Sequence, residues 1–207
     1  MKTKIVLFAI FFACILAQTE LIQEYEAELP LEAQVDPEDD YIDNTIDFFR
    51  SFFYPATWDR SRTLYKQCDA AWKNTMMGDK TICQVGCLMS SVSMALHSRG
   101  KSIDGKASNP GTLNAWLKKH GGYSGNLFVW GSVAPLGLKF SKHTTNHSDI
   151  RNCLCSNSCE VILNVNKGGH YVLAKGYDGS GYTVNDPGFS KTRYTTAEIY
   201  RASIFYS

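Results

Sequence analysis

The chain has 207 residues, of which 44% are hydrophobic and 13% aromatic, and its formal net charge is +1. This length fits one domain of about 150 residues with extensions, large enough to bury a core without a metal ion or a disulfide. No basic run is interleaved with aromatic residues, so we do not expect nucleic acid as a partner.

Residues 1–17 have the pattern of a secretory signal peptide. Lys2 and Lys4 precede an unbroken apolar run from Ile5 to Leu16, and Ala17 follows at a small-residue cleavage position. The apolar run is shorter than the roughly 20 residues that span a bilayer. We therefore expect cleavage near Ala17 and a mature protein that is secreted, or held in the lumen of the secretory pathway, with no membrane attachment.

Charge is divided unevenly along the rest of the chain. Residues 18–49 hold eleven acidic residues and no Lys or Arg, whereas residues 50–207 hold nineteen Lys and Arg against nine Asp and Glu, a net charge of +10. Residues 18–55 have two interpretations: a disordered acidic tail without a core-forming pattern, or a prosegment that binds the basic domain by charge complementarity. Both interpretations leave residues 56–207 as the folded domain.

The hydrophobic pattern predicts a helical first half and a sheet-rich second half. Cys87–Arg99 carries apolar residues at helical spacing, and a second helix begins at Pro110 after the cap Asn109 and ends at Gly121-Gly122. Short runs rich in Val, Leu and Tyr predict strands over residues 161–165, 171–177 and 182–185. This order of elements is typical of the α+β class.

Cys87 is the candidate nucleophile because it follows Gly86 and begins the first predicted helix. The helix dipole and the unpaired N–H groups at that position favour the thiolate, and the glycine lets a substrate backbone approach closely. The competing interpretation is a disulfide. Once Cys14 leaves with the signal peptide, six cysteines remain, and an even number in a secreted chain first suggests three disulfides.

Two further polar residues stand at the ends of predicted strands. His170 follows Gly168-Gly169 at the start of one strand, an exposed rim position where an imidazole titrates near neutral pH. Asp186 closes the next strand, directly after Asn185. Alone, His170 would be interpreted as an ordinary surface or capping histidine, so its role depends on whether Asp186 reaches it.

The register of the hairpin that joins these strands decides whether the two side chains meet. A two-residue turn sets Asp186 opposite Leu173, on the sheet face away from His170. One extra residue sets Asp186 opposite Val172, on the same face as His170 and one diagonal step away. We therefore predict an odd-length loop or a bulge at Asp178–Gly181, with one of its two glycines at positive φ.

A thiol hydrolase also needs a donor for the developing oxyanion, and two glutamines precede the nucleophile. Gln84 lies three residues before Cys87, in the turn that enters the helix, and lacks the reach to fold back onto it. Gln67 is far enough away to return with its amide free. The sequence therefore predicts Gln67 and the backbone N–H of Cys87 as the two donors.

The ordered set of motifs Gln67, Gly86-Cys87, Gly169-His170 and Asn185-Asp186-Pro187 resembles the papain-like cysteine peptidases. The resemblance is to the family similar to bacteriocin-processing double-glycine peptidases, and it covers about residues 63–190. The whole set is far more specific than any single motif. Two features depart from the family pattern: the extra cysteines, and the lack of a transporter domain after the matched residues. Specificity for double-glycine leaders is therefore not implied.

The resemblance implies a fold and four roles. The fold is papain-like, with a helical N-terminal half whose catalytic helix packs on an antiparallel sheet. Gln67 is implied as the oxyanion donor, Cys87 as the nucleophile, His170 as the base and Asp186 as the residue that orients the base.

The remaining cysteines suggest two disulfides if Cys87 is free. Cys68 with Cys83 would close a 16-residue loop between the segments that flank the site. Among Cys153, Cys155 and Cys159, the pair Cys153–Cys159 closes a short loop without demanding unusual geometry.

Residues 143–159 carry two other candidate features, a metal site and a glycosylation site. His143 and His147 with the cysteine trio suggest a zinc cluster, but a secreted protein favours disulfides and no predicted helix aligns the histidines. We therefore expect no metal. Asn146-His147-Ser148 is a glycosylation sequon that indicates a surface position.

Together these patterns predict a secreted cysteine-dependent peptidase or amide hydrolase that acts through an acyl-enzyme. It would need no cofactor, act on a peptide or protein substrate, and work as a monomer. Two alternatives stay open. One is a catalytically inactive, disulfide-stabilised binding domain of the same fold, and the other is a thiol acyltransferase that uses the same residues.

Overall fold

The computed structural model describes residues 60–207. The predictions for the signal peptide (1–17) and the acidic segment (18–55) lie outside these residues. The helices are α3 (Ile82–Val85), α4 (Cys87–Ser98), α5 (Pro110–Lys119) and α6 (His147–Ser156). The strands are β1 (Ser102–Ile103), β2 (Lys106–Ala107), β3 (Tyr123–Ser124), β4 (Leu127–Phe128), β5 (Lys139–Thr144), β6 (Cys159–Val165), β7 (His170–Tyr177), β8 (Gly181–Asn185), β9 (Arg193–Thr195) and β10 (Arg201–Tyr206).

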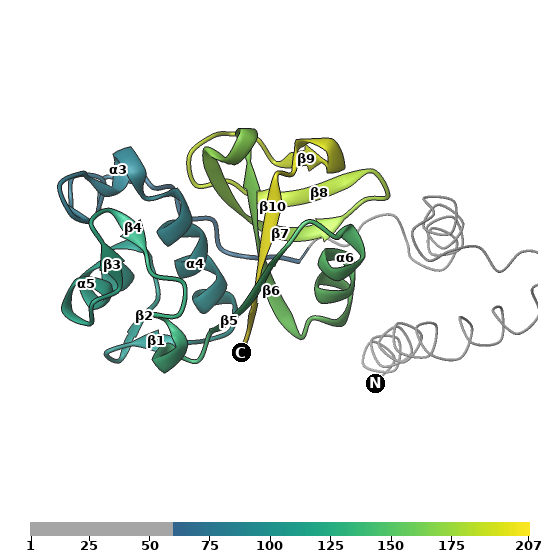
Figure 1. Cartoon of the computed structure of the whole chain (residues 1–207). Coiled ribbons are helices and arrows are strands. Elements are labelled where there is room, and N and C mark those ends of the chain that lie inside the picture. Colours follow the sequence, from purple (N-terminus) through teal and green to yellow (C-terminus); the bar gives the residue numbers. More distant parts are fainter. Residues whose placement is uncertain (1–59) are drawn as a thin grey trace, which may run out of the picture. The chain divides into compact units, whose positions relative to one another are not determined.

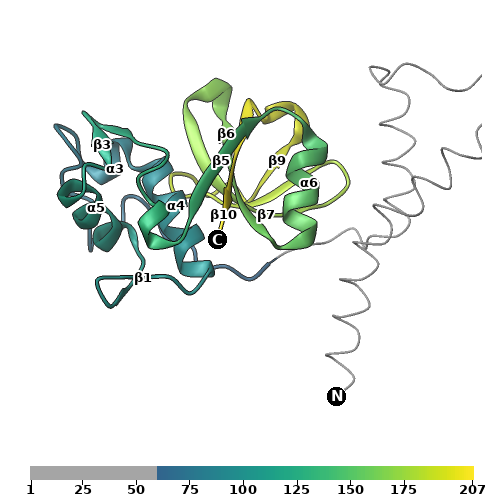
Figure 2. The same ribbon diagram turned by 60° about the horizontal axis from the view of Figure 1, so that its bottom comes forward.

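An antiparallel sheet of six strands forms the second half, in the order β5-β10-β6-β7-β8-β9. The first half holds α3, α4 and α5 with two small hairpins, β1-β2 and β3-β4. Helix α4 packs on β7 and stands between the sheet on one side and α3 and α5 on the other (Figures 1 and 2). The predicted mixture of helices and antiparallel sheet is confirmed.

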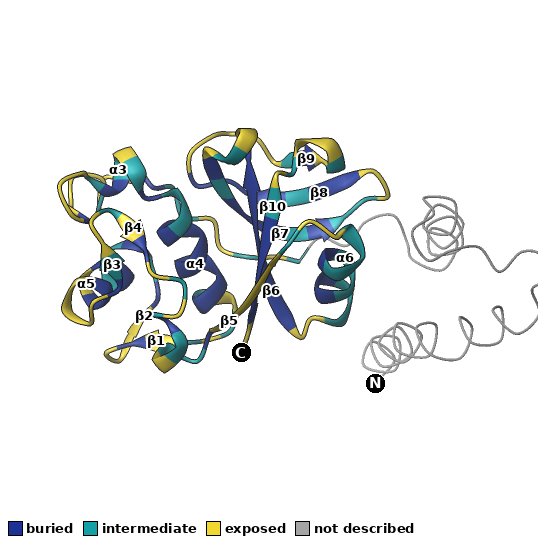
Figure 3. Ribbon diagram, viewed as in Figure 1, coloured by how far each residue is buried: buried dark blue, intermediate teal, exposed yellow. Residues whose placement is uncertain are grey.

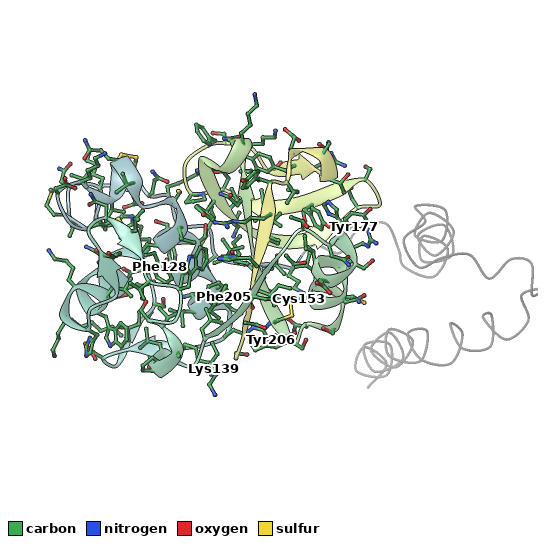
Figure 4. All side chains as sticks on the ribbon, in the orientation of Figure 1. Phe128, Lys139, Cys153, Tyr177, Phe205 and Tyr206 are labelled. Carbon is green, nitrogen blue, oxygen red and sulfur yellow. A yellow bond between two sulfur atoms is a disulfide. The ribbon has the colours of Figure 1, made fainter. Side chains whose placement is uncertain are left out.

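Two cores lie on opposite faces of the sheet because side chains alternate along each strand. Ile162, Leu173 and Phe205 face the first core, which includes the buried side of α4. Figure 4 shows Phe205 between the sheet and the helical half. Their strand neighbours face the second core, which α6 covers. Every residue of β6 is buried, and most residues of α4, β8 and β10 are buried too (Figure 3).

The predicted helices and the three predicted strands are present. Helix α4 ends one residue before the predicted end, and α5 has Asn109 as its cap, with the Asn109 side chain accepting from the N–H of Thr112. Strands β6, β7 and β8 each begin one or two residues earlier than predicted. Helix α6 and the neighbouring edge strand β5 were not predicted, because both sequences are short and polar. The buried residues Ile150, Cys153 and Leu154 of α6 do recur at helical spacing.

The extra residue of the β7–β8 hairpin does not lie in the loop, where it was predicted, but within a strand. The loop itself is a two-residue turn, in which the Asp178 N–H donates to the Gly181 carbonyl at 3.0 Å and Gly179 has a φ of 92°. The extra residue is Lys175, where the register shifts between Ala174 and Gly176. The bulge lies within the strand because the tight turn, closed by Asp178, leaves no room for it in the loop.

The shift has the predicted effect on register. Leu173 pairs with Asn185, so the next position along the ladder sets Asp186 opposite Val172. His170 and Asp186 therefore project from the same face of the sheet.

Residues 60–67, which we call the strap, join the two halves of the domain. Arg60 donates to the Leu154 carbonyl at the end of α6, and the Asn185 amide donates to the carbonyls of Arg62 and Thr63 at 3.0 and 3.2 Å. Further along, the Lys66 ammonium donates to the Asp186 carbonyl at 2.8 Å. The strap thus contacts both the sheet and the loop after β8. Within residues 60–207, no helix has the length and apolar character to cross a bilayer.

Candidate active site

Cys87 is the first residue of α4 and, among the cysteines of residues 60–207, carries the free thiol. Gly86 separates it from α3, and a Cβ on Gly86 would lie 2.4 Å from the Ile82 carbonyl oxygen. Only glycine therefore fits the sharp step between the two helices. The step leaves the Cys87 N–H at the start of α4, where backbone N–H groups have no partner within their own helix.

Both predicted disulfides are present: Cys68–Cys83, with a Cα–Cα distance of 4.3 Å, and Cys153–Cys159, at 5.4 Å. The interpretation of Cys87 as half of a disulfide is wrong, because its thiol is free. The first disulfide lies beside the candidate site, since Cys68 follows Gln67 and Cys83 lies in α3. Figure 4 labels Cys153, which lies on the α6 side of the sheet.

His170 begins β7 and is held by the loop that leads into it. Asn166, Lys167 and Gly168 all have positive φ, at 52°, 54° and 94°. Two consecutive non-glycine residues in this region cost conformational energy, and such strain persists where the surrounding structure imposes it. Asn164 imposes it here, because its buried amide donates to the carbonyls of Gly168 and His170 at 3.0 Å each.

Asp186 follows β8 directly, and its buried carboxylate accepts four hydrogen bonds. Oδ1 accepts from His170 Nε2 at 2.7 Å and from the backbone N–H groups of Gly188 and Phe189 at 2.8 Å each. Oδ2 accepts from the Tyr194 hydroxyl at 2.8 Å. Burial raises the pKa of Asp186, but these hydrogen bonds outweigh burial and hold the pKa below its usual range.

The structure brings the Cys87 thiol to the same imidazole. Burial lowers the pKa of His170, but hydrogen bonds to Asp186 and to Cys87, together with the charges of both, raise it to about 9. Since Nε2 faces Asp186, the Nδ1 edge of the ring is the one left for Cys87. The three residues thus form one connected array, Cys87–His170–Asp186.

Gln67 is held between α3 and the loop after β8. Its backbone N–H donates to the Pro187 carbonyl at 2.9 Å, and its Nε2 donates to the Cys83 carbonyl at 2.7 Å. This bond uses one of the two Nε2 protons and leaves the other free. Oε1 is buried, and no described residue donates to it.

Gln84 has a different function from Gln67. Its side chain accepts from the N–H of Thr81, while the Thr81 hydroxyl accepts from the Gln84 N–H, so the two residues cap α3. This reciprocal cap uses the Gln84 side chain to start a helix. The Gln84 side chain is therefore engaged in the cap, and the role of Gln67 as oxyanion donor stays a prediction.

The part that Gly188 plays in the site was not predicted, although Gly188 follows the Asn-Asp-Pro motif directly. A Cβ there would lie 2.8 Å from His170 Cε1 and 3.4 Å from Gln67 Oε1. Gly188 therefore lets Gln67 and His170 approach from either side of the loop after β8. Tyr194 and Asn164 were missed too, and their contacts have no counterpart in any short sequence motif.

The histidines considered for zinc have other partners. His143 Nδ1 bonds the Ser203 hydroxyl at 3.0 Å, and His147 Nδ1 bonds the Tyr182 hydroxyl at 2.7 Å. Two of the three cysteines in that hypothesis are joined in the Cys153–Cys159 disulfide, which removes their thiolates as ligands. Asn146 is exposed and caps α6 by accepting from the Ser148 N–H at 2.7 Å.

Comparison with known proteins gives a likeness to solved structures. No family model and no curated protein sequence matches the chain. Among solved structures, the chain is similar to a double glycine motif protease from an AMS/PCAT transporter, crystallised in complex with the leader peptide. The identity is 15% and the TM-score 0.47, and the match covers 73% of this chain and 96% of that one. At these values the likeness carries no information about the activity of this chain.

Proposed function

We propose that this chain is a cysteine-dependent peptidase, or a related amide hydrolase, of the papain-like kind. Cys87 is the nucleophile, His170 the base and Asp186 the residue that orients it. The observation that carries the proposal is that His170 joins two partners. The free Cys87 thiol hydrogen-bonds to its ring, and the ring Nε2 donates to Asp186 Oδ1 at 2.7 Å. A nucleophile, a base and an orienting group in this order form the constellation used for acyl transfer.

Acylation starts from the state in which the proton shared by Cys87 and His170 resides on His170, whose ring is protonated at neutral pH. The thiolate attacks the carbonyl carbon of the substrate, and the carbonyl oxygen becomes an oxyanion that Gln67 Nε2 and the Cys87 N–H stabilise. His170 then gives its proton to the departing amine as the C–N bond breaks. The product of this half-reaction is an acyl-enzyme on Cys87 and a free amine.

Deacylation uses the same residues in the reverse order. His170 takes a proton from water, and the resulting hydroxide attacks the thioester carbonyl. Collapse of the second oxyanion releases the carboxylic acid and returns the proton to Cys87. If an amine replaces water in this step the enzyme is an acyltransferase, and the ratio of amide to acid products distinguishes the two activities.

The ionisation of His170 supports its proposed role beside Cys87. With the pKa of His170 at about 9, the ring is protonated at neutral pH. A cation next to a thiol favours the nucleophilic thiolate form. The inactive binding domain with three disulfides is disfavoured, because Cys87 is free.

We propose that the protein works in an oxidising compartment after loss of residues 1–17. Two disulfides within residues 60–207 support this proposal, since such bonds persist in secreted proteins and are rare in reducing compartments. Expression in a secreting host followed by N-terminal sequencing of the medium fraction tests it. A protein retained in the cell with Met1 intact would contradict it.

Alkylation of Cys87 tests the proposed array without knowledge of the substrate. The full chain is treated with iodoacetamide at pH 6, and the modified residue is located by mass spectrometry. Cys87 should react much faster than an ordinary thiol, which is almost fully protonated at that pH. Cys87→Ser should abolish the label, and His170→Ala should slow labelling at least tenfold.

His120→Ala is the matched control, because His120 caps α5 and bonds the Trp116 carbonyl. It should label at the wild-type rate. Equal labelling rates in His170→Ala and wild type would rule out the array. A peptide library incubated with the full chain then identifies the bond that is cleaved.

A further inference from the structure

The two oxygens of the Asp186 carboxylate are held unequally. Oδ1 accepts from His170 and from two backbone N–H groups, whereas among residues 60–207 Tyr194 is the donor to Oδ2. The Asp186 side chain is fully buried and Tyr194 is 1% exposed. Solvent therefore has little access to replace the tyrosine hydroxyl.

We propose that Tyr194 is a positioning residue that keeps Asp186 ionised and fixes the plane of its carboxylate behind His170. This inference rests on the proposed function, in which Asp186 orients the base. Tyr194 touches neither the substrate nor the reacting atoms.

The physical need for this hydroxyl follows from the burial of the carboxylate. Burial favours the protonated acid, and hydrogen bonds to the ionised form oppose burial. The donors at Oδ1 anchor one oxygen but leave the carboxylate free to rotate about that anchor. A donor at Oδ2 fixes the plane, so that Oδ1 keeps its lone pair directed at His170 Nε2.

The position of Tyr194 makes it a constant donor. It lies in β9 opposite Tyr182 of β8, and the Lys191 ammonium stands 4.2 Å from the centroid of its ring. Burial, with the hydrogen bond to Asp186 and the charges of Asp186 and Glu198, raises the pKa of Tyr194 well above its usual range. The hydroxyl therefore stays protonated wherever the enzyme is folded and active.

Several other ionisable groups face this pair and are unchanged by the test. His170 approaches from β7, and the Lys66 ammonium bonds the Asp186 carbonyl from the strap. Lys191 and Glu198 flank β9, and they bond each other at 2.5 Å. A substitution confined to the Tyr194 hydroxyl leaves all four groups in place.

The substitution Tyr194→Phe tests the inference, because phenylalanine keeps the ring and removes only the donor. Two quantities are measured on the full chain: the titration of the Asp186 carboxyl by 13C NMR, and the pH dependence of Cys87 alkylation. The Asp186 pKa should rise by about one pH unit when one hydrogen bond to its charged form is lost. The acid limb of the alkylation profile should move up in pH with it.

Tyr182→Phe is the matched control. Tyr182 is buried in the same sheet, opposite Tyr194, and its hydroxyl bonds His147 instead of Asp186. This variant should lose comparable stability while both titrations stay at wild-type values. Identical Asp186 titrations in Tyr194→Phe and Tyr182→Phe would overturn the inference.

A second variant keeps the test decisive if Tyr194→Phe fails to fold. Tyr194→3-fluorotyrosine retains a hydroxyl that is a stronger donor, so the Asp186 pKa should fall below the wild-type value. An unchanged or higher value would overturn the inference. The NMR titration is independent of catalysis, whereas failure of the proposed function would appear as alkylation of wild-type Cys87 that does not depend on His170.

Discussion

The two halves of the domain position their candidate catalytic residues by different means. In the helical half, Cys87 is placed by contacts between residues close in sequence, namely the step at Gly86 and the cap on α3. Gln67 is held by the neighbouring Cys68–Cys83 disulfide and by one distant contact, its backbone bond to Pro187. In the sheet half, His170 and Asp186 are placed by strand register. One extra residue in one strand decides whether their side chains meet. Single substitutions in the helical half should therefore each lower the activity in part. A change of strand register in the sheet half should abolish the activity.

Deletion of Asn185 is the strongest test of this difference. Removing this one residue of β8 moves Asp186 to the position opposite Leu173, on the face away from His170. The rate of acylation should fall by roughly 10³–10⁴-fold, the cost of losing the orienting carboxylate of a triad. The measurement is kcat/KM on the best peptide substrate, with circular dichroism to confirm the fold.

Deletion of Lys175 is the control, because it removes the bulged residue, leaves Ala174 paired with Val184 and keeps Asp186 opposite Val172. It should retain near wild-type kcat/KM. Equal losses of activity in the two deletion variants would show that strand register does not determine the His170–Asp186 contact.

Removal of the Gln67 amide comes next in size. Gln67→Ala should lower kcat by about 10²–10³-fold, since one oxyanion donor is lost, while the rate of Cys87 alkylation stays near wild type. Gln84→Ala is the control within the same half. It breaks the α3 cap and should cost about 1 kcal/mol of stability with little change in kcat. Equal kcat values for the two variants would contradict the assignment of Gln67.

Asp186→Asn should shift the ionisation of His170. Loss of the charge and of the charge-assisted bond should lower the pKa of His170 from about 9 by one to two pH units. The measurement is an NMR titration of the ring protons of His170. Asp178→Asn is the control: Asp178 lies in the turn of the same hairpin, where the Arg193 guanidinium holds its pKa at about 2. It should leave the His170 titration unchanged.

The raised pKa of His170 also predicts how the stability of the folded chain depends on pH. His170 has a higher pKa in the folded chain than the unfolded value of about 6.5, so its contribution to stability is complete below pH 6.5. That contribution should disappear as the pH rises from 6.5 through about 9. Urea denaturation of wild type at pH 6 and pH 9.5 should show a larger difference than denaturation of Asp186→Asn.

Removal of the disulfides should have the smallest effect on activity. Replacing both Cys68 and Cys83 with Ser should cost about 3 kcal/mol of stability and lower kcat less than tenfold, because Gln67 loses a neighbouring restraint. The Cys153–Cys159 disulfide closes a shorter loop. Replacing both of these cysteines with Ser should therefore cost about 2 kcal/mol of stability and leave kcat unchanged. If both pairs lower kcat equally, the Cys68–Cys83 disulfide does not act through Gln67.

Much of the candidate site was predictable because its parts obey local rules. The start of α4 at Cys87, the cap at Asn109, the two disulfides and the choice of Gln67 over Gln84 all follow from spacing and helix-end chemistry. The need for an extra residue in the β7–β8 hairpin followed from the two-residue period of strands.

Other features depend on contacts that no local pattern encodes. Lys175 looks like any other strand residue, so the position of the bulge was predicted wrongly. Tyr194 reaches Asp186 only after the chain returns through β9. The short and polar helix α6 is stabilised by packing on β6, which the sequence does not reveal. Such features depend on tertiary packing, which overrides local preference.

The strap sets a limit on how far the chain can be shortened from its N-terminal side. Arg62 pairs with the buried carboxylate of Glu160, and removing one partner of a buried ion pair typically costs about 3–5 kcal/mol. Lys66, a few residues further on, bonds the carbonyl of Asp186 itself. An enzyme that cut before Arg60 would leave every strap contact in place, whereas trimming past Arg62 would leave Arg99 as the sole cation paired with Glu160 among residues 60–207. Any shortening of the chain from this side therefore meets a boundary that is defined by contacts of the strap.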